Sequence, residues 1–138
     1  MNYRVVKRVL SVVLMLIVGC CSAAAVDIQP RWSYILTIGG DIDISSFGTA
    51  TVNGDGTARA PDVNKLVITL DLQQYINGKW ETKKSWSQTS QLFSINTDDY
   101  SWAVAHGYSY RLYITLKAYN GNKLLETGTG IFNYGYFK

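Results

Sequence analysis

The stretch that most constrains the fold is residues 108–119, where core-type and polar side chains alternate without interruption. A period of two is that of a β-strand with one face in an apolar core and the other face toward solvent. We therefore expect a long central strand here. The side chains predicted to face the core are Tyr108, Tyr110, Leu112, Ile114, Leu116 and Ala118.

The first 25 residues have the pattern of a secretory signal peptide. Basic residues precede an almost wholly apolar run over residues 9–18, and the small-residue segment Ala23-Ala24-Ala25 follows. The apolar run is shorter than the ~20 residues that a membrane-spanning helix needs. We predict cleavage after Ala25, which gives a secreted protein with one domain over residues 26–138. The basic residues are Arg4, Lys7 and Arg8.

A second processing route remains open, because Ile17-Val18-Gly19-Cys20 resembles a bacterial lipobox. Cleavage at that site would leave Cys20 acylated and would anchor the domain at the outer face of the cytoplasmic membrane. The position of Ala23-Ala24-Ala25 favours release instead, since small residues precede a signal peptidase site. Membrane attachment is therefore expected only if Cys20 is lipidated.

Charge and cysteine content both change once residues 1–25 are set aside. Three of the 13 Lys and Arg residues lie there and none of the ten Asp and Glu residues does, so the remainder is formally neutral. A neutral domain with dispersed charges argues against nucleic acid and anionic membranes as main partners. Cys20 and Cys21 are the only cysteines, so residues 26–138 have no disulfide framework and no cysteine metal site.

Further alternating segments, separated by turn signals, raise the expected number of strands to about seven. In the first segment, Leu36 is expected to face the core with Trp32 and Tyr34, and Gly39-Gly40 is expected to introduce a bulge or kink. Asn53-Gly54-Asp55-Gly56 carries two hairpin signals and is expected to interrupt the second segment. The segments are 31–45, 49–60, 65–73, 79–86, 91–95, 108–119 and 123–136.

About seven short strands in a domain of roughly 100 residues predict an all-β fold, an immunoglobulin-like antiparallel β-sandwich. Gly107-Tyr108-Ser109-Tyr110 resembles a tyrosine corner, in which a Tyr hydroxyl closes the preceding loop onto backbone groups. The two sheets would be held together by apolar burial alone. A small closed β-barrel remains the alternative, because the same alternation fits it.

The chain carries, in order, R-W-S-Y-I, I-D-I-S-S-x-G-T-A-T-V, L-V-I-T-L, N-G-K-W with K-S-W-S, and G-Y-S-Y-R-L-Y-I-T. Behind a signal peptide, this order resembles a family of small secreted single-domain proteins of Gram-positive bacteria, recorded as a domain of unknown function. The resemblance covers essentially all of residues 26–138. It implies a compact secreted β domain and supplies no catalytic residues.

Catalytic and metal-binding signals are weak. His106 is the only histidine, and its place in a polar loop favours a solvated or loop-bracing side chain over a catalytic base. Asp41 and Asp43 share one strand face and could hold calcium with Asp98 and Asp99, but an acidic solvated face is the favoured interpretation, since no loop has a full ligand pattern. We expect a non-enzymatic protein without a cofactor.

Aromatic residues are the main candidates for function. Tyr113 and Tyr119 lie on the polar side of the central strand, and Trp80 and Trp86 are expected to share one face of an edge strand. Flat rings beside polar groups suit a sugar or protein ligand. We therefore predict a carbohydrate- or cell-wall-binding module. The alternatives are aromatic pairs that only stabilise an exposed sheet, and an interaction protein that pairs through an edge strand, with its oligomeric state left open.

Overall fold

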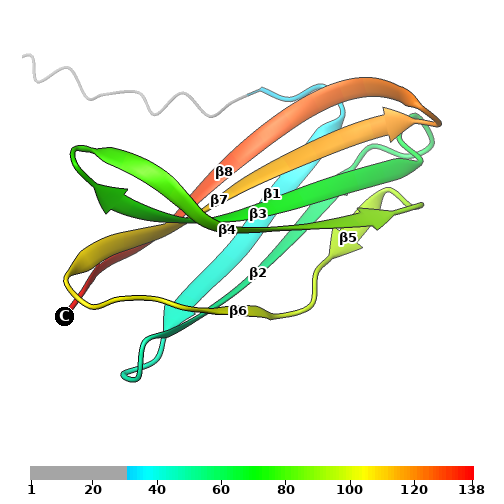
Figure 1. Ribbon diagram of the computed structural model, residues 1–138. Helices are drawn as coiled ribbons and strands as arrows, with labels where there is room; N and C mark the ends of the chain where they lie inside the picture. Colours follow the sequence, from blue (N-terminus) through cyan, green and yellow to red (C-terminus); the bar gives the residue numbers. More distant parts are fainter. Residues whose placement is uncertain (1–30) are drawn as a thin grey trace, which may run out of the picture. The chain divides into compact units, whose positions relative to one another are not determined.

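The structure is a computed structural model that describes residues 31–138 of the chain. The predicted signal peptide over residues 1–25, the cleavage site after Ala25 and the alternative lipidation of Cys20 lie outside the described residues. Residues 31–138 form eight strands in two antiparallel sheets that pack face to face (Figure 1). This arrangement confirms the predicted β-sandwich. Within the described residues the two sheets remain separate, so the alternative of a closed barrel is wrong.

The two sheets have four strands each. Sheet A contains β1 (Ile35–Ile44), β2 (Thr49–Ala58) and β5 (Ser94–Asn96) in that order, and β6 (Tyr100–Ala103) also pairs with β2. Sheet B has the order β4 (Lys79–Ser90), β3 (Lys65–Ile76), β7 (Tyr108–Asn120) and β8 (Lys123–Phe137). In Figure 1, β1 and β2 pass behind sheet B.

The strand order of sheet B corresponds to the C′-C-F-G sheet of immunoglobulin-like sandwiches, with β7 in the F position. The predicted tyrosine corner lies at the start of this strand. The Tyr110 hydroxyl donates a hydrogen bond to the backbone oxygen of Ala105 at 2.7 Å and accepts one from Gln74 Nε2 at 3.0 Å. The corner therefore ties the segment before β7 to the buried side of sheet B.

Strands β3 and β7 of sheet B supply most of the large, fully buried side chains of the core, and β2 of sheet A leaves room for them. On β3 and β7, the alternation places every predicted core residue from Tyr110 to Ala118 and from Leu66 to Leu72 inside. Opposite them, β2 presents only small side chains. These are Ala50, Val52, Gly54, Gly56 and Ala58.

The hairpin expected at residues 53–56 is wrong, because β2 runs straight through this segment. A Cβ atom on Gly54 would lie 2.7 Å from Leu70 Cδ2, and one on Gly56 would lie 2.5 Å from Leu116 Cδ2. The glycines are therefore needed for the close approach of the two sheets. Pairing with β1 on one side and with β5 and β6 on the other overrides the local turn preference.

Strand β1 also departs from its predicted pattern. Its bulge lies between Ile35 and Thr37, and the Gly39-Gly40 pair continues the ladder without a register shift. The extra residue at the bulge is Leu36, which is 56% exposed, whereas Ile35 is buried. The expectation that Leu36 faces the core is therefore wrong, because a bulge shifts the alternation by one residue.

The count of seven strands is one short for residues 31–138. The additional strand is β6, in a segment expected to be a polar loop, and β5 is shorter than the predicted strand over residues 91–95. Two predicted hairpin turns are confirmed. Asn77 and Gly78 have φ of 52° and 79° between β3 and β4, and Gly121 has φ of 58° between β7 and β8.

Glu126 of β8 joins the segment before β1 to sheet B. Its carboxylate accepts hydrogen bonds from the backbone N–H groups of Ser33, Tyr34 and Ile35 at 2.7, 2.8 and 2.7 Å. Partial burial acts to raise the pKa of Glu126, but the three N–H groups, helped by Arg59, outweigh it and hold the pKa below its ordinary value of 4.5.

Glu126→Gln is expected to lower the free energy of unfolding at neutral pH by about 1 kcal/mol, the usual contribution of a side chain that caps backbone N–H groups. Because the folded-state pKa is depressed, the carboxylate stabilises the fold above pH 4.5, and this contribution is lost as the pH falls through the folded-state pKa. Urea unfolding at about pH 7 and about pH 3 measures the effect. The role would be contradicted if Glu126→Gln lowered the free energy of unfolding by the same amount at both pH values. It would also be contradicted if the loss equalled that of the control Glu81→Gln.

Candidate functional site

The solvent-facing side of sheet B carries rings and hydrogen-bonding side chains around Arg111. The register places Gln73 of β3 opposite Arg111 of β7, and Tyr75 of β3 opposite Trp80 of β4. Tyr113 lies two residues beyond Arg111 and therefore on the same face. We call these five residues, Gln73, Tyr75, Trp80, Arg111 and Tyr113, the Arg111 face.

Arg111 is held by its neighbours in this face. Its guanidinium carbon lies 4.3 Å from the centroid of the Trp80 ring and 5.8 Å from that of the Tyr113 ring. Its Nε donates a hydrogen bond to Gln73 Oε1 at 2.7 Å. The rings of Tyr75 and Trp80 have centroids 5.1 Å apart and are tilted by 56°. Contacts of this kind contribute about 0.5–1 kcal/mol each at exposed sites, so together they favour this arrangement of the side chains.

Further polar groups surround the Arg111 face. Asp71, opposite Tyr113, accepts a hydrogen bond from Ser85 Oγ at 2.5 Å. Asn133 of β8 is exposed and lies opposite Arg111. Tyr75 itself is 45% exposed. The surface therefore offers a ligand the faces of aromatic rings, together with hydrogen-bond donors and acceptors held in fixed positions.

Trp80 and Trp86 lie on opposite sides of sheet B, so the expectation that they share a face is wrong. Between Leu72 and Gln73 the pairing with β4 shifts by one residue, which leaves Lys83 as the extra residue of a β-bulge. Trp86 is opposite the core residue Leu70, and its ring stacks on Tyr100 of β6 with centroids 5.4 Å apart and planes 16° apart. Trp86 thus joins the two sheets at the β4 edge.

Tyr119 lies on the same side of sheet B as Tyr113, but six positions further along β7, about 20 Å away at the usual strand spacing. Lys65 Nζ lies 4.6 Å from the centroid of its ring. The four predicted binding residues are therefore divided. Trp80 and Tyr113 belong to the Arg111 face, Tyr119 lies at the far end of the same surface, and Trp86 lies on the opposite side.

The outer side of sheet A is acidic. Asp41 and Asp43 are exposed and project from β1. They lie opposite Asn53 and Thr51 of β2, which are half-buried. Asn53 Nδ2 donates a hydrogen bond to Asp99 Oδ1 at 2.8 Å, so an amide separates Asp99 from the β1 carboxylates. Across residues 31–138, no three His, Cys, Asp or Glu side chains are grouped closely enough to hold a metal ion.

His106 braces the segment before β7. Its Nδ1 is in hydrogen-bond contact with the backbone oxygen of Lys138, and its ring stacks on Phe137 with centroids 4.1 Å apart and planes 24° apart. This is the loop-bracing role that the sequence favours for the residue. The contacts hold His106 against the end of β8.

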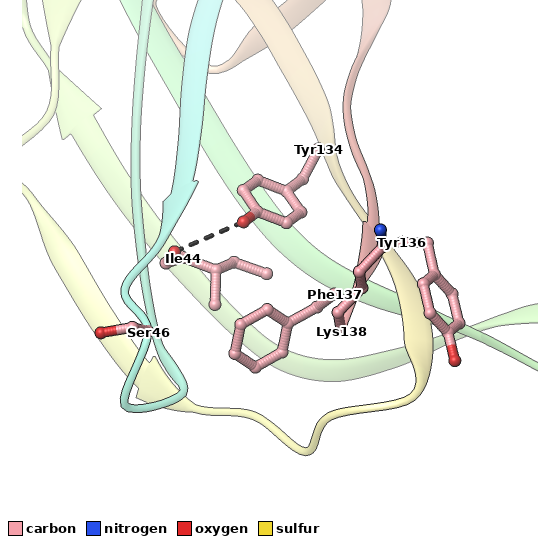
Figure 2. A pocket seen from close by; sticks show the side chains of 6 residues that line it. All are labelled: Ile44, Ser46, Tyr134, Tyr136, Phe137 and Lys138. Atoms are coloured by element: carbon pink, nitrogen blue, oxygen red, sulfur yellow. Dashed lines mark hydrogen bonds between the residues drawn. The ribbon is translucent and has the colours of Figure 1, made fainter.

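A shallow pocket of about 460 Å³ lies between the ends of β1 and β8. Figure 2 shows Tyr134 reaching toward Ile44, whose backbone oxygen accepts a hydrogen bond from the Tyr134 hydroxyl at 3.4 Å. The Phe137 ring lies beside Ile44 in the same view. The aromatic residues of the 131–137 segment thus serve partly to close this end of the sandwich, and Tyr136 remains 61% exposed.

Three members of the Arg111 face were not predicted as site residues, namely Arg111, Tyr75 and Gln73. The signal for Tyr75 is present in the sequence, because a two-residue Asn77-Gly78 turn pairs Ile76 with Lys79 and therefore Tyr75 with Trp80. Gln73 depends on the pairing of β3 with β7, which no local pattern specifies.

No protein-family model, curated protein or solved structure matches the chain. The resemblance to a Gram-positive family of secreted proteins therefore stays a prediction. The described residues contain no helical segment that could serve as a membrane span.

Proposed function

We propose that the protein is a secreted, non-catalytic domain that binds carbohydrate of the cell wall or extracellular space through the Arg111 face. The observation that carries this proposal is the position of Arg111 between Trp80 and Tyr113 on the open side of sheet B. The core lies on the other side of sheet B, so this cluster is available to a ligand.

The chemistry of the Arg111 face suits a sugar. A pyranose ring has an apolar face of C–H groups, which packs on an aromatic ring, and an edge of hydroxyl groups, which needs donors and acceptors. Trp80, Tyr75 and Tyr113 provide the rings, while Arg111 and Gln73 provide donors and acceptors that already constrain one another. Because these contacts already restrict the side chains, a ligand loses less entropy in fixing them.

Binding of the purified protein to insoluble peptidoglycan and to a panel of polysaccharides tests the proposal. Tyr113→Ala and Trp80→Ala are each expected to weaken retention at least tenfold, the usual consequence of removing about 1.4 kcal/mol or more of contact energy. Phe47→Ala is the matched control, because Phe47 is 95% exposed and lies in the turn between β1 and β2. Trp86→Ala is expected to reduce stability instead, since Trp86 packs between the sheets.

Two outcomes would overturn the proposal. In one, no polymer retains the wild-type protein. In the other, Tyr113→Ala and Trp80→Ala bind as well as Phe47→Ala, and the ring cluster then serves only the sheet. Unfolding curves of each variant separate lost binding from lost folding, because a folded variant keeps its cooperative transition.

A second candidate function is self-association through β8, and one specific observation favours it. Residues 127–137 of this edge strand carry no charged side chain, whereas the other edge of sheet B, β4, carries Lys79, Lys83 and Lys84. Charged residues protect edge strands from pairing. Oligomers whose size increases with concentration in sedimentation, together with absent polymer binding, would favour this candidate over the first.

A further inference from the structure

A second pocket lies on the opposite side of sheet B from the Arg111 face. It has a volume of about 390 Å³, within the range of about 300–1,000 Å³ that is typical of small-molecule sites. It is formed between the β3–β4 hairpin and the segment that joins β6 to β7. Its lining includes Gln74, Lys83, Trp102, Ala105, Tyr108 and Tyr110. We call it the Lys83 pocket.

The β-bulge in β4 adds Lys83 to the lining of this pocket and leaves Lys84 beside it. Lys84 is opposite the core-facing Leu72, and Lys83 is the residue that the bulge adds. Lys83 lines the pocket, and Lys84 Nζ lies 4.6 Å from the centroid of the Trp102 ring, which lines it as well. In a regular strand, successive side chains point to opposite faces. The bulge turns Lys83 toward the side of sheet B on which Lys84 also lies, and bulges commonly re-aim side chains at functional sites.

The rest of the lining provides ring surfaces and a fixed polar floor. Trp102 is 43% exposed and Tyr108 is half-buried, so both rings are accessible. The floor is the chain of hydrogen bonds from Gln74 to the Tyr110 hydroxyl and from that hydroxyl to the oxygen of Ala105. Because the hydrogen bonds of this chain are satisfied, it positions polar atoms without needing to rearrange for a ligand.

The charge of the Lys83 pocket is positive. No carboxylate lines it, and Lys83 is the only charged side chain that does. The nearest acidic residue by register is Glu81, opposite Gln74. Together, Glu81, Lys83 and Lys84 leave one net positive charge in or beside the pocket, whose lining includes three aromatic rings.

From this arrangement we infer that the Lys83 pocket binds a single sugar residue that carries a carboxylate. Lys83 lies where it can donate to the carboxylate, and Trp102 offers its ring to the apolar face of the sugar. An ammonium group is a compact charge with three donors, so it can form charge-assisted hydrogen bonds with a carboxylate. The inference does not rest on the Arg111 face, which lies across sheet B and shares no residue with this pocket.

Titration of the isotope-labelled protein with glucuronate and with glucose, followed by NMR, tests the inference. Glucuronate is expected to shift the indole N–H signal of Trp102 and to bind at least about tenfold more tightly than glucose, the usual effect of a charge-assisted hydrogen bond. Lys83→Gln is expected to remove this preference while glucose binding stays unchanged. Lys79→Gln, at the start of the same strand and outside the pocket, is the matched control.

The outcomes are distinct from those for the Arg111 face. Tyr113→Ala should leave the binding of glucuronate unchanged even where it abolishes polymer binding. Equal affinity for glucuronate and glucose, equal behaviour of Lys83→Gln and Lys79→Gln, or shifts confined to residues outside the pocket would each overturn the inference. Tighter binding of glucose 6-phosphate than of glucuronate would also overturn it, because the pocket would then be selective for phosphate.

Discussion

Gly54→Val is expected to destabilise the sandwich by about 3 kcal/mol, because the inner face of β2 has no space for a side chain at this position. A Cβ atom there would lie 2.7 Å from Leu70 Cδ2, 3.0 Å from Ile114 Cδ1 and 3.1 Å from Ile68 Cδ1. All three neighbouring side chains are buried, so none can turn into solvent. Urea unfolding measures the loss. The control Asp55→Val places the same side chain on the solvent side of β2 and is expected to change stability by less than about 0.5 kcal/mol.

Combining Gly54→Val with Leu70→Ala tests whether the two positions are in direct contact. Leu70→Ala alone is expected to cost about 3 kcal/mol, as a cavity in a well-packed core does. In the double variant, the three carbon atoms added at Gly54 enter the space of the three removed at Leu70. The double variant is therefore expected to lose at least about 1 kcal/mol less than the sum of the single losses. Strictly additive losses would show that the two positions are not in the direct contact described above.

Tyr110→Phe is expected to lower the free energy of unfolding by about 2 kcal/mol. The substitution keeps the buried ring but removes the hydroxyl that Gln74 donates to and that donates to Ala105. Gln74 would be left buried without this hydrogen bond, which costs more than the bond itself contributes, and the partly buried oxygen of Ala105 would lose its partner. Urea unfolding measures the loss, and Tyr136→Phe, on a largely exposed ring, is the control. Adding Gln74→Leu should recover part of the loss, because it removes one of the unpaired groups.

The pH dependence of the same variant provides a second measurement. Burial is the largest influence on Tyr110 and raises its pKa above the ordinary value of 10.0, although the hydrogen bond from Gln74 lowers it. A raised folded-state pKa means that the contribution to stability is complete below pH 10.0 and is lost as the pH rises through the folded-state pKa. The difference in the free energy of unfolding between wild type and Tyr110→Phe should therefore become smaller in alkaline solution. A difference that becomes larger at alkaline pH would contradict the burial of this hydroxyl.

The parts of the fold that the sequence predicts are those in which local alternation and burial agree. The leucine face of β3, the core face of β7 and the turn at Asn77-Gly78 are of this kind. The prediction fails at β2, because Gly54 and Gly56 carry a local turn signal while their actual role is to admit Leu70 and Leu116. In a sequence, a glycine shows only that a side chain is absent. Whether a turn or the close packing of a neighbouring sheet requires the glycine depends on contacts with residues far away in the sequence.

The sequence also predicts only part of the candidate site. Tyr113 follows from the parity of the central strand, whereas the separation of Trp80 from Trp86 depends on a one-residue shift against β3 that the sequence of β4 does not reveal. The same shift creates the Lys83 pocket, whose lining comes from segments between Gln74 and Tyr110. Bulges and pockets arise from the pairing of strands, so periodicity within one strand cannot specify them.

The two outer surfaces of the sandwich differ in sign, although the domain as a whole is close to neutral. Sheet A exposes Asp41, Asp43 and Asp55, whereas the outer side of sheet B carries Arg111, Lys117 and Lys65 with only Asp71 among them. Such a molecule has an electric dipole across its thickness. Near a negatively charged polymer it experiences a torque that turns sheet B toward the polymer before contact, so that productive encounters become more frequent at low ionic strength.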